Sequence, residues 1–263
     1  MWRVPACSLL AVLLAAAVTP TVSAVGSPLR DAGGKRRAAG YALLLDGTSG
    51  HVSVPDSPSL QLERTGSFTV AFRVLLHSYA NNPLPRFWQK GPQYLCVMGD
   101  RTNPRYRTVA LEVQNSSLGG NTNGGATEYW GNTKLVTDRW YAIAVTFDQS
   151  LSKNQARIYL DGVPENMTTI YQWSGSLFPT AGEPFEIGRR PNDMARMLDG
   201  VIDSMSVYTS ALRASQIADL ARGQRVLGAV ADWEFDEGAG MAARDSSGHG
   251  NTGAIVDGAY VPN

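Results

Sequence analysis

The apolar residues of this sequence recur mostly at every second position, the spacing that is typical of β-strands with one buried face. The alternation is regular in residues 67–74, and residues 139–147 form the strongest predicted strand. Further short strands are predicted at 41–46, 51–54, 94–98, 108–114, 156–160, 184–188 and 200–208. Asp161-Gly162, a dipeptide favoured in tight hairpin turns, follows one of them.

The period changes after residue 208, where the spacing becomes helical. Thr209 or Ser210 can cap a short helix, and Gly223 can end it. The apolar positions that define this helix are Leu212, Ile217, Leu220 and Ala221. About a dozen short strands with a single helix predict an antiparallel β-sandwich or jelly roll.

The first 24 residues read as a secretory signal peptide. A short basic start precedes the apolar run 9–18, and Val22-Ser-Ala24 offers a small-x-small cleavage pattern. The apolar run is too short to span a bilayer, although a membrane anchor is the alternative interpretation. Residues 25–40, rich in Gly, Ser and charge, are predicted to be a disordered linker. A secreted protein is therefore expected, without a membrane span.

Charge and cysteine content narrow the possible functions. The net charge is zero, which gives no reason to expect a nucleic-acid partner. The cysteines are Cys7, which leaves with the signal peptide, and Cys96. Cys96 lies in an apolar run and is interpreted as a buried small hydrophobe, so the fold must be stabilised by its core rather than by disulfides.

Several motifs, taken in order, resemble the laminin-G-like domains of the concanavalin A-like lectin/glucanase superfamily. They are LLLDG at 43–47, HVSVPDS at 51–57, SFTVAFR at 67–73, WYAIAVT at 140–146, IYLDG at 158–162, FEIG at 185–188 and GVIDSMSVY at 200–208. The resemblance implies an all-β, concanavalin A-like jelly-roll sandwich of two antiparallel sheets with one short helix, spanning residues 41–257.

The order of the motifs is unusual at the C-terminus. ADWEFDEGAG at 231–240 and RDSSGHGN at 244–251 resemble the segment that opens most members of the family. Either the domain is circularly permuted, with residues 229–257 completing its own sandwich, or a truncated second repeat begins here. Permutation is the preferred hypothesis, because chain termini often lie close together in compact domains.

The superfamily also includes glucanases, whose retaining members place two glutamates on one strand face roughly 5 Å apart. Glu234 and Asp236 begin such a pattern, but Glu237 falls on the opposite face of the strand. The histidines His51, His77 and His249 are isolated from any nucleophile or zinc-site spacing. No catalytic residue is therefore predicted.

By resemblance to the family, Asp46 and Asp203 are candidate ligands of a structural Ca²⁺, a hard cation that prefers oxygen ligands. The alternative is that Asp46 shapes its Asp-Gly turn and that Asp203 hydrogen-bonds to neighbouring backbone. Ser204, where the family often has a second Asp, weakens the calcium interpretation.

Aromatic residues placed in or beside loops suggest a sugar-binding surface, since aromatic rings stack on pyranose faces. The candidate ligand-binding residues are Trp88, Tyr129, Trp130, Tyr171, Trp173 and Arg190. The predicted function is non-catalytic recognition of an extracellular glycan or glycoprotein. The alternatives are a carbohydrate-active enzyme of the same fold, either a glycoside hydrolase or a lyase, and a protein-binding adhesion module.

Two triplets match the N-glycosylation acceptor pattern, Asn115-Ser-Ser117 and Asn166-Met-Thr168. Both asparagines are therefore predicted to lie on the surface.

Overall fold

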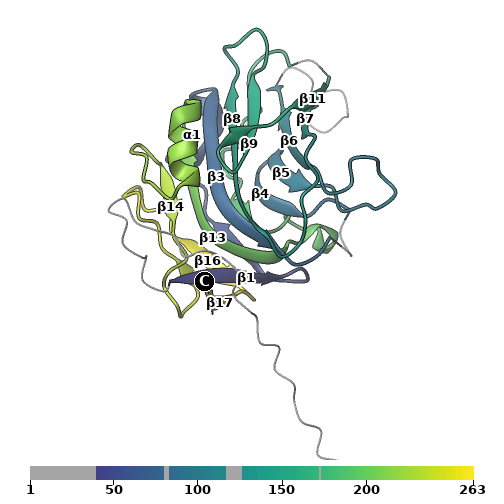
Figure 1. Ribbon diagram of the computed structural model, residues 1–263. Helices are drawn as coiled ribbons and strands as arrows, with labels where there is room; N and C mark the ends of the chain where they lie inside the picture. The colour runs from purple at the N-terminus through teal and green to yellow at the C-terminus, as the bar shows by residue number, and fades with distance from the viewer. Residues whose placement is uncertain (1–39, 80–82, 117–125, 172) are drawn as a thin grey trace, which may run out of the picture.

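The computed structural model describes residues 40–79, 83–116, 126–171 and 173–263. Within these residues the chain forms two antiparallel β-sheets that face each other across a common hydrophobic core (Figure 1). The predicted jelly-roll sandwich is thereby confirmed. The predicted signal peptide and nearly all of the predicted linker lie outside the described residues.

One sheet has eight strands, with the long strands β3 and β13 at its centre. Its order is β10 (Val163–Pro164), β9 (Ala156–Leu160), β8 (Trp140–Asp148), β3 (Ser67–Leu76), β13 (Asp199–Tyr208), β1 (Tyr41–Asp46) and β17 (Ala259–Pro262), with β14 (Ala231–Trp233) also pairing with β13. The alternation predicted for residues 67–74 and 139–147 therefore belongs to two neighbouring strands.

The other sheet has nine strands. Its order is β11 (Met167–Ile170), β7 (Ala126–Gly131), β6 (Val109–Gln114), β5 (Gln93–Val97), β4 (Arg86–Lys90), β12 (Phe185–Ile187), β2 (His51–Val54), β16 (Gly253–Val256) and β15 (Ala242–Ala243). The sequence did not predict β7, because its residues follow a Gly- and Asn-rich stretch that indicates a loop.

The core is filled by the inward-facing side chains of both sheets. Phe68 on β3 meets Trp88 on β4 with ring centroids 6.0 Å apart. Trp88 in turn stacks on Phe185, with 5.7 Å between the ring centroids. Burying an aromatic side chain of this size contributes roughly 1.5–3 kcal/mol, so the contact between Phe68 and Trp88 joins the two layers strongly.

The helix α1 (Ala214–Ala221) lies along the outer face of the eight-stranded sheet, beside β3 (Figure 1). Its buried residue Ile217 packs in a small cluster that includes Tyr208 and Leu212. The predicted cap at Thr209 or Ser210 is wrong: the helix begins after Arg213, whose N–H donates to the Gln216 side chain. No helix among the described residues is long and apolar enough to cross a membrane.

The C-terminal segment takes part in both sheets. Strand β14 pairs with β13, β17 with β1, and β16 with β2. Trp233 of β14 is fully buried, and its indole N–H donates to the Asn251 carbonyl at 2.8 Å. The segment therefore packs into this sandwich, and β17 extends the sheet beyond residue 257, the predicted end of the domain. Circular permutation relative to other members of the family is still a hypothesis drawn from the order of the sequence motifs.

The two ends of the described domain are adjacent. The backbone N–H of Asn263 donates to the Gly40 carbonyl at 3.1 Å. Termini placed this close allow the same sandwich to be built from a different starting strand.

Candidate functional site

A row of polar residues crosses the nine-stranded sheet on the face that points away from the core. The row consists, strand by strand, of Ser53, Glu186, Gln89, Tyr94, Glu112 and Glu128, each opposite the next in the strand register. Their neighbours Val52, Leu95 and Leu111 are fully buried in the core. Because successive side chains of a strand point to opposite faces, the row must lie on the outer face. We call it the polar row.

At the β6–β7 end of the polar row, two half-buried glutamates face each other directly. Glu112 and Glu128 are register partners on neighbouring strands. The Tyr94 hydroxyl donates to Glu112, and the Trp130 indole N–H donates to Glu128 at 2.7 Å. Like charges directly opposite each other destabilise a strand pair, so this arrangement is not explained by fold stability.

Each of the two aromatic donors lies under an arginine. The guanidinium carbon of Arg86 is 3.5 Å from the Tyr94 ring centroid, and that of Arg105 is 5.3 Å from the Trp130 ring centroid. Cation–π contacts of this kind hold a ring in place. The site therefore consists of two similar units, each with an arginine over an aromatic ring that donates a hydrogen bond to a glutamate.

The raised pKa of Tyr94 supports its role as a hydrogen-bond donor. Burial is the main cause that raises the pKa of the Tyr94 phenol far above its ordinary value, and the Glu112 charge adds to this effect. The hydroxyl therefore keeps its proton at physiological pH and continues to donate to Glu112.

The glutamate near the other end of the polar row is neutralised. Glu186 is buried and accepts two hydrogen bonds from Arg189, each at 2.8 Å, and one from the Ser53 hydroxyl at 3.0 Å. A bidentate arginine pair of this geometry is strong and specific. Glu186 is therefore interpreted as part of the scaffold, which leaves Glu112 and Glu128 as the carboxylates that can accept from a ligand.

Beside these glutamates lies a small apolar cluster on the same outer face. Cys96, Met98, Ala110 and Trp130 form it, with Leu84, Tyr94 and Ile170 at its border. Cys96 is buried here, and burial raises the pKa of its thiol to about 11. The thiol is therefore protonated and unreactive at neutral pH. This agrees with the prediction from the sequence that Cys96 is a buried small hydrophobe.

The structure does not bring the six predicted ligand-binding residues together at one site. Trp88 and Tyr129 are buried in the core, so the expectation that they present their rings to a ligand is wrong. The reason is that β4 and β7 include these residues as inward-facing strand positions, whereas the sequence around them predicts loops. Of the six, Trp130 contacts the polar row, through the hydrogen bond from its indole N–H to Glu128.

The remaining three predicted residues lie elsewhere. Tyr171 is 59% exposed and follows β11. Trp173 packs edge-on against the core residue Phe147, with 4.9 Å between the ring centroids. Arg190 belongs to an exposed turn, where it lies 3.7 Å from the Asp193 carboxylate.

The two predicted calcium ligands are engaged separately. Asp46 accepts hydrogen bonds from the backbone N–H groups of Ser49 and Gly50, at 2.9 and 2.8 Å, while Asp203 pairs with Arg73 at 2.6 Å. Asp46 lies opposite Asp199 in the register, so Asp203 is four residues further along β13, a separation of roughly 13 Å. The two carboxylates therefore do not fit a common calcium site.

No group of three or more His, Cys, Asp or Glu side chains suited to a metal ion occurs among the residues that the structure describes.

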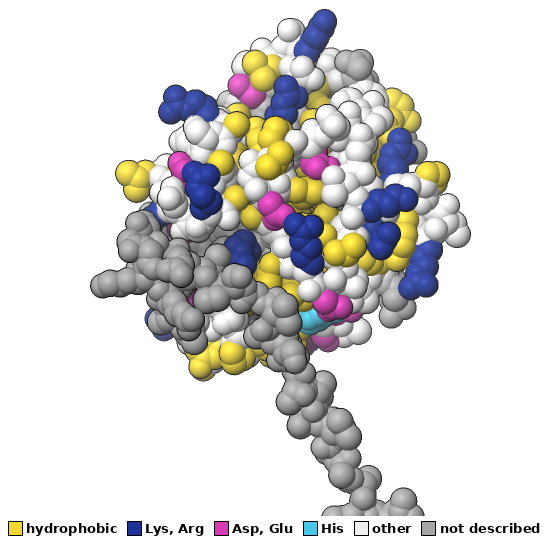
Figure 2. All heavy atoms as spheres, viewed as in Figure 1, with side chains coloured by type: hydrophobic (Ala, Val, Ile, Leu, Met, Phe, Trp, Pro, Cys, Tyr) yellow, Lys and Arg dark blue, Asp and Glu magenta, His cyan; other side chains and the backbone are white. Residues whose placement is uncertain are grey.

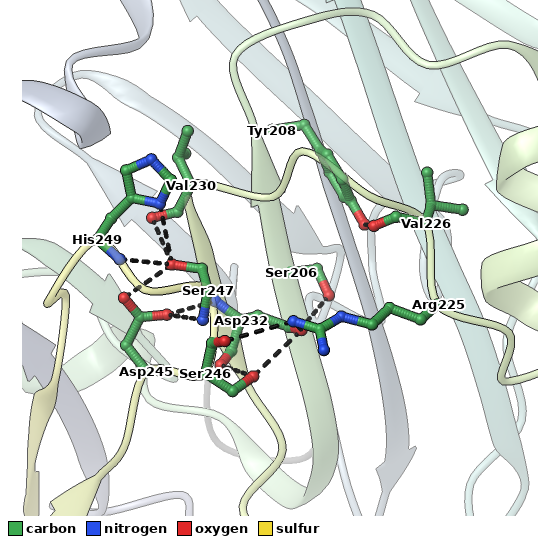
Figure 3. Close-up of polar contacts among 10 residues, drawn as sticks. All are labelled: Ser206, Tyr208, Arg225, Val226, Val230, Asp232, Asp245, Ser246, Ser247 and His249. Atoms are coloured by element: carbon green, nitrogen blue, oxygen red, sulfur yellow. Dashed lines mark hydrogen bonds and ion pairs between the residues drawn. The ribbon is translucent and has the colours of Figure 1, made fainter.

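The C-terminal turn contains a serine, a histidine and an aspartate in contact, but their geometry is that of a turn (Figure 3). The Ser247 hydroxyl donates to Asp245 at 2.9 Å, and it lies 3.3 Å from the ring nitrogen Nδ1 of His249. Asp245 also accepts the N–H groups of Asp232 and Ser247. Because Asp245 orients backbone and serine rather than the histidine, this group lacks the order of a catalytic triad.

The two predicted glycosylation asparagines differ in exposure. Asn115 is 2% exposed and forms an isolated β-bridge with Leu177, so its predicted surface position is wrong. Asn166 is exposed, directly before β11.

Comparisons with known proteins give a fold and a family. The structure resembles that of a candidate carbohydrate binding protein from Bacteroides ovatus with a TM-score of 0.64 and 17% sequence identity, covering 87% of this chain and 61% of that one. It also resembles a heptameric SAP-like pentraxin from Limulus polyphemus (TM-score 0.49, 11% identity, 86% and 92% covered) and a Trypanosoma rangeli sialidase (TM-score 0.40, 15% identity, 60% and 23% covered). At 17% identity the likeness to the Bacteroides ovatus structure shows the fold alone.

The search of curated proteins found no match. Residues 46–218 match the laminin-G-type sequence profile described as "Concanavalin A-like lectin/glucanases superfamily". The chain belongs to this superfamily.

Proposed function

We propose that this domain is a secreted, non-catalytic recognition module that binds carbohydrate, free or on a glycoprotein, through the polar row. The observation that carries the proposal is the pair of arginine–aromatic–glutamate units centred on Glu112 and Glu128. The name of the Bacteroides ovatus structure, a candidate carbohydrate binding protein, agrees with this class of ligand.

The chemistry of the polar row suits sugar hydroxyls. Register partners across a strand pair have their Cβ atoms about 5 Å apart, so Glu112 and Glu128 can accept hydrogen bonds from neighbouring hydroxyls of one sugar ring. Gln89, half-buried in the same row, belongs to the scaffold, because its Oε1 accepts from Arg86 at 3.3 Å and its Nε2 donates to the Gly91 carbonyl at 2.8 Å. Tyr94 and Trp130 act through their O–H and N–H groups, because an arginine lies over each ring. The proposed recognition is therefore polar, without ring stacking.

A glycoside hydrolase is the second candidate, and the direct opposition of the two glutamates favours it. Register partners have their Cβ atoms about 5 Å apart, which allows their carboxyl groups to reach the separation of roughly 5 Å that a retaining hydrolase uses. However, the two glutamates have closely similar surroundings, each accepting a hydrogen bond from an aromatic donor, whereas the acid and the nucleophile of a hydrolase need environments that differ. Binding is therefore the better-supported function.

The distribution of charge also suits an uncharged ligand. Figure 2 shows both basic and acidic side chains on the one face of the molecule that it draws. The zero net charge of the chain agrees with this picture. A polyanionic partner, which needs a concentrated positive surface, is less well supported than a neutral glycan. Localisation outside the cell rests on the predicted signal peptide.

The experiment is a glycan-array screen of the protein with and without EDTA, followed by titration calorimetry with the best ligand. Glu112→Gln and Glu128→Gln should each weaken binding by about tenfold or more, since a hydrogen bond to a charged group is worth about 1.5–3 kcal/mol. Glu183→Gln, at an exposed glutamate that is not part of the polar row, is the matched control.

Three outcomes count against the proposal. Binding of no glycan in either condition refutes the lectin function. Ligand binding that survives both substitutions removes the polar row from it. Ligand hydrolysis that is lost in Glu112→Gln makes the domain an enzyme. Equal binding with and without EDTA would remove calcium from recognition.

A further inference from the structure

The two N-glycosylation triplets have the same sequence pattern but opposite structural settings. Asn115 is buried, and the residue after it is tied down because the Ser116 N–H donates to the Ser176 carbonyl at 2.9 Å. A branched, strongly hydrated glycan has to lie in water, so a glycan on Asn115 is incompatible with the folded chain. Asn166 and Thr168, in contrast, are both exposed.

Asn166 precedes a strand that, among the described residues, lies at the edge of its sheet. Strand β11 ends the nine-stranded sheet and pairs on one side with β7. The Asn132 N–H donates to the Asn166 carbonyl at 3.2 Å. Because hydrogen-bonded positions alternate in an antiparallel pair, the backbone groups of Met167 and Thr169 point away from β7. These groups are a template on which another strand could add.

The other sheet ends in the described part of the chain carry features that discourage such pairing. Strand β10 is two residues long and ends in Pro164, β15 is also two residues long, and β17 ends in Pro262. Short edges and proline are recognised protections against edge-to-edge association. Strand β11, Met-Thr-Thr-Ile, has neither proline nor charge, and the exposed Tyr171 follows it.

We infer that Asn166 is the N-glycosylation site of this chain, that Asn115 is unmodified, and that the glycan on Asn166 shields the β11 edge from pairing with a second copy. The glycan is attached one residue before the first outward-facing backbone groups, so it occupies the space that an added strand would need. The inference depends on entry into the secretory pathway and is independent of the proposed sugar-binding function.

The first test is glycan occupancy of the full chain, with its own leader, in a eukaryotic secretory host. Intact mass before and after enzymatic removal of N-glycans should show one glycan. Asn166→Gln should abolish it, and Asn115→Gln should leave it in place. A glycan on Asn115, or none on Asn166, would overturn the site assignment.

The second test uses two substitutions of Thr168 that both destroy the acceptor triplet. Thr168→Ala leaves an uncharged edge, whereas Thr168→Lys places a charge on it. Because Thr168 lies opposite Trp130 in the register, self-association rather than sugar binding is the readout that compares the two variants. Light scattering after size exclusion should show concentration-dependent self-association for Thr168→Ala, and monomer for Thr168→Lys and the glycosylated wild type. A monomeric Thr168→Ala variant, or equal association of the two variants, would refute the shielding role.

Discussion

Replacing Trp233 by alanine tests whether the C-terminal segment stabilises the whole sandwich. Trp233 is fully buried in β14, and its ring centroid lies 5.7 Å from that of Phe185 in the opposite sheet. The substitution removes this contact across the core and leaves the Asn251 carbonyl without its indole donor. A defect in the C-terminal segment should therefore destabilise both sheets at once.

The size of the effect follows from the volume removed. A buried Trp→Ala change costs about 3–5 kcal/mol. In a domain of this size, each kcal/mol lowers the Tm by roughly 2–4 °C, so a fall of about 6–20 °C is expected. Trp233→Phe, which keeps an aromatic ring but removes the N–H, should give a smaller fall.

The assay is thermal unfolding followed by circular dichroism and by calorimetry. A single transition that moves as a whole is expected for Trp233→Ala. Met241→Ala, in the same segment but at a side chain that is 61% exposed, is the control and should change stability by less than about 0.5 kcal/mol. An unchanged main transition in Trp233→Ala would show that residues 231–262 are not integral to the sandwich.

Three further predictions concern single positions. Partial burial would raise the pKa of Asp46, but hydrogen bonds from residues 48–50 outweigh it and hold the pKa well below its usual value. The ionised Asp46 carboxylate therefore stabilises the folded state above about pH 4, and this contribution is lost at lower pH. The Tm of Asp46→Asn should fall less between pH 7 and pH 3 than the Tm of the wild type. An equal fall in Tm contradicts this prediction. Because burial raises the Cys96 pKa to about 11, the native protein should not react with Ellman's reagent at pH 8 but should react once denatured, and fast native labelling would disprove the burial. A Cβ added at Gly200 would lie 2.3 Å from the Leu75 carbonyl oxygen, so Gly200→Ala should cost about 1–3 kcal/mol in urea unfolding, and wild-type stability would contradict the tight β3–β13 approach.

The patterns of residues 67–74 and 139–147 predicted strands of a sandwich, because a period of two is a local property of the chain. That these two strands are neighbours comes from the structure. The change of period after residue 208 likewise predicted the helix, although its cap was placed too early. Strand β7 could not be predicted in this way. Its residues follow a Gly- and Asn-rich stretch, and long-range pairing with β6 and β11 rather than local propensity makes them extended.

Most of the candidate site could not be predicted from the sequence. Glu112 falls on the polar face of a predicted strand, which is a weak signal, while Glu128 falls on the strand that was missed. Their direct opposition depends on the β6–β7 register, which a one-residue slip would destroy. Trp88 and Tyr129 were predicted to bind a ligand because they are aromatic and lie near segments that predict loops. Neither property reveals that a side chain faces the core.

The motifs and alternation of the chain are sufficient for its superfamily, its two-layer architecture and its single helix, since these depend on local periodicity and on motif spacing. Tertiary pairing alone places Glu112 beside Glu128, buries Asn115 while exposing Asn166, and inserts β14, β16 and β17 into both sheets. The physical reason is that a strand's sequence defines its two faces but not its neighbours. The neighbours are chosen by core packing and hydrogen-bond register between segments far apart in the chain.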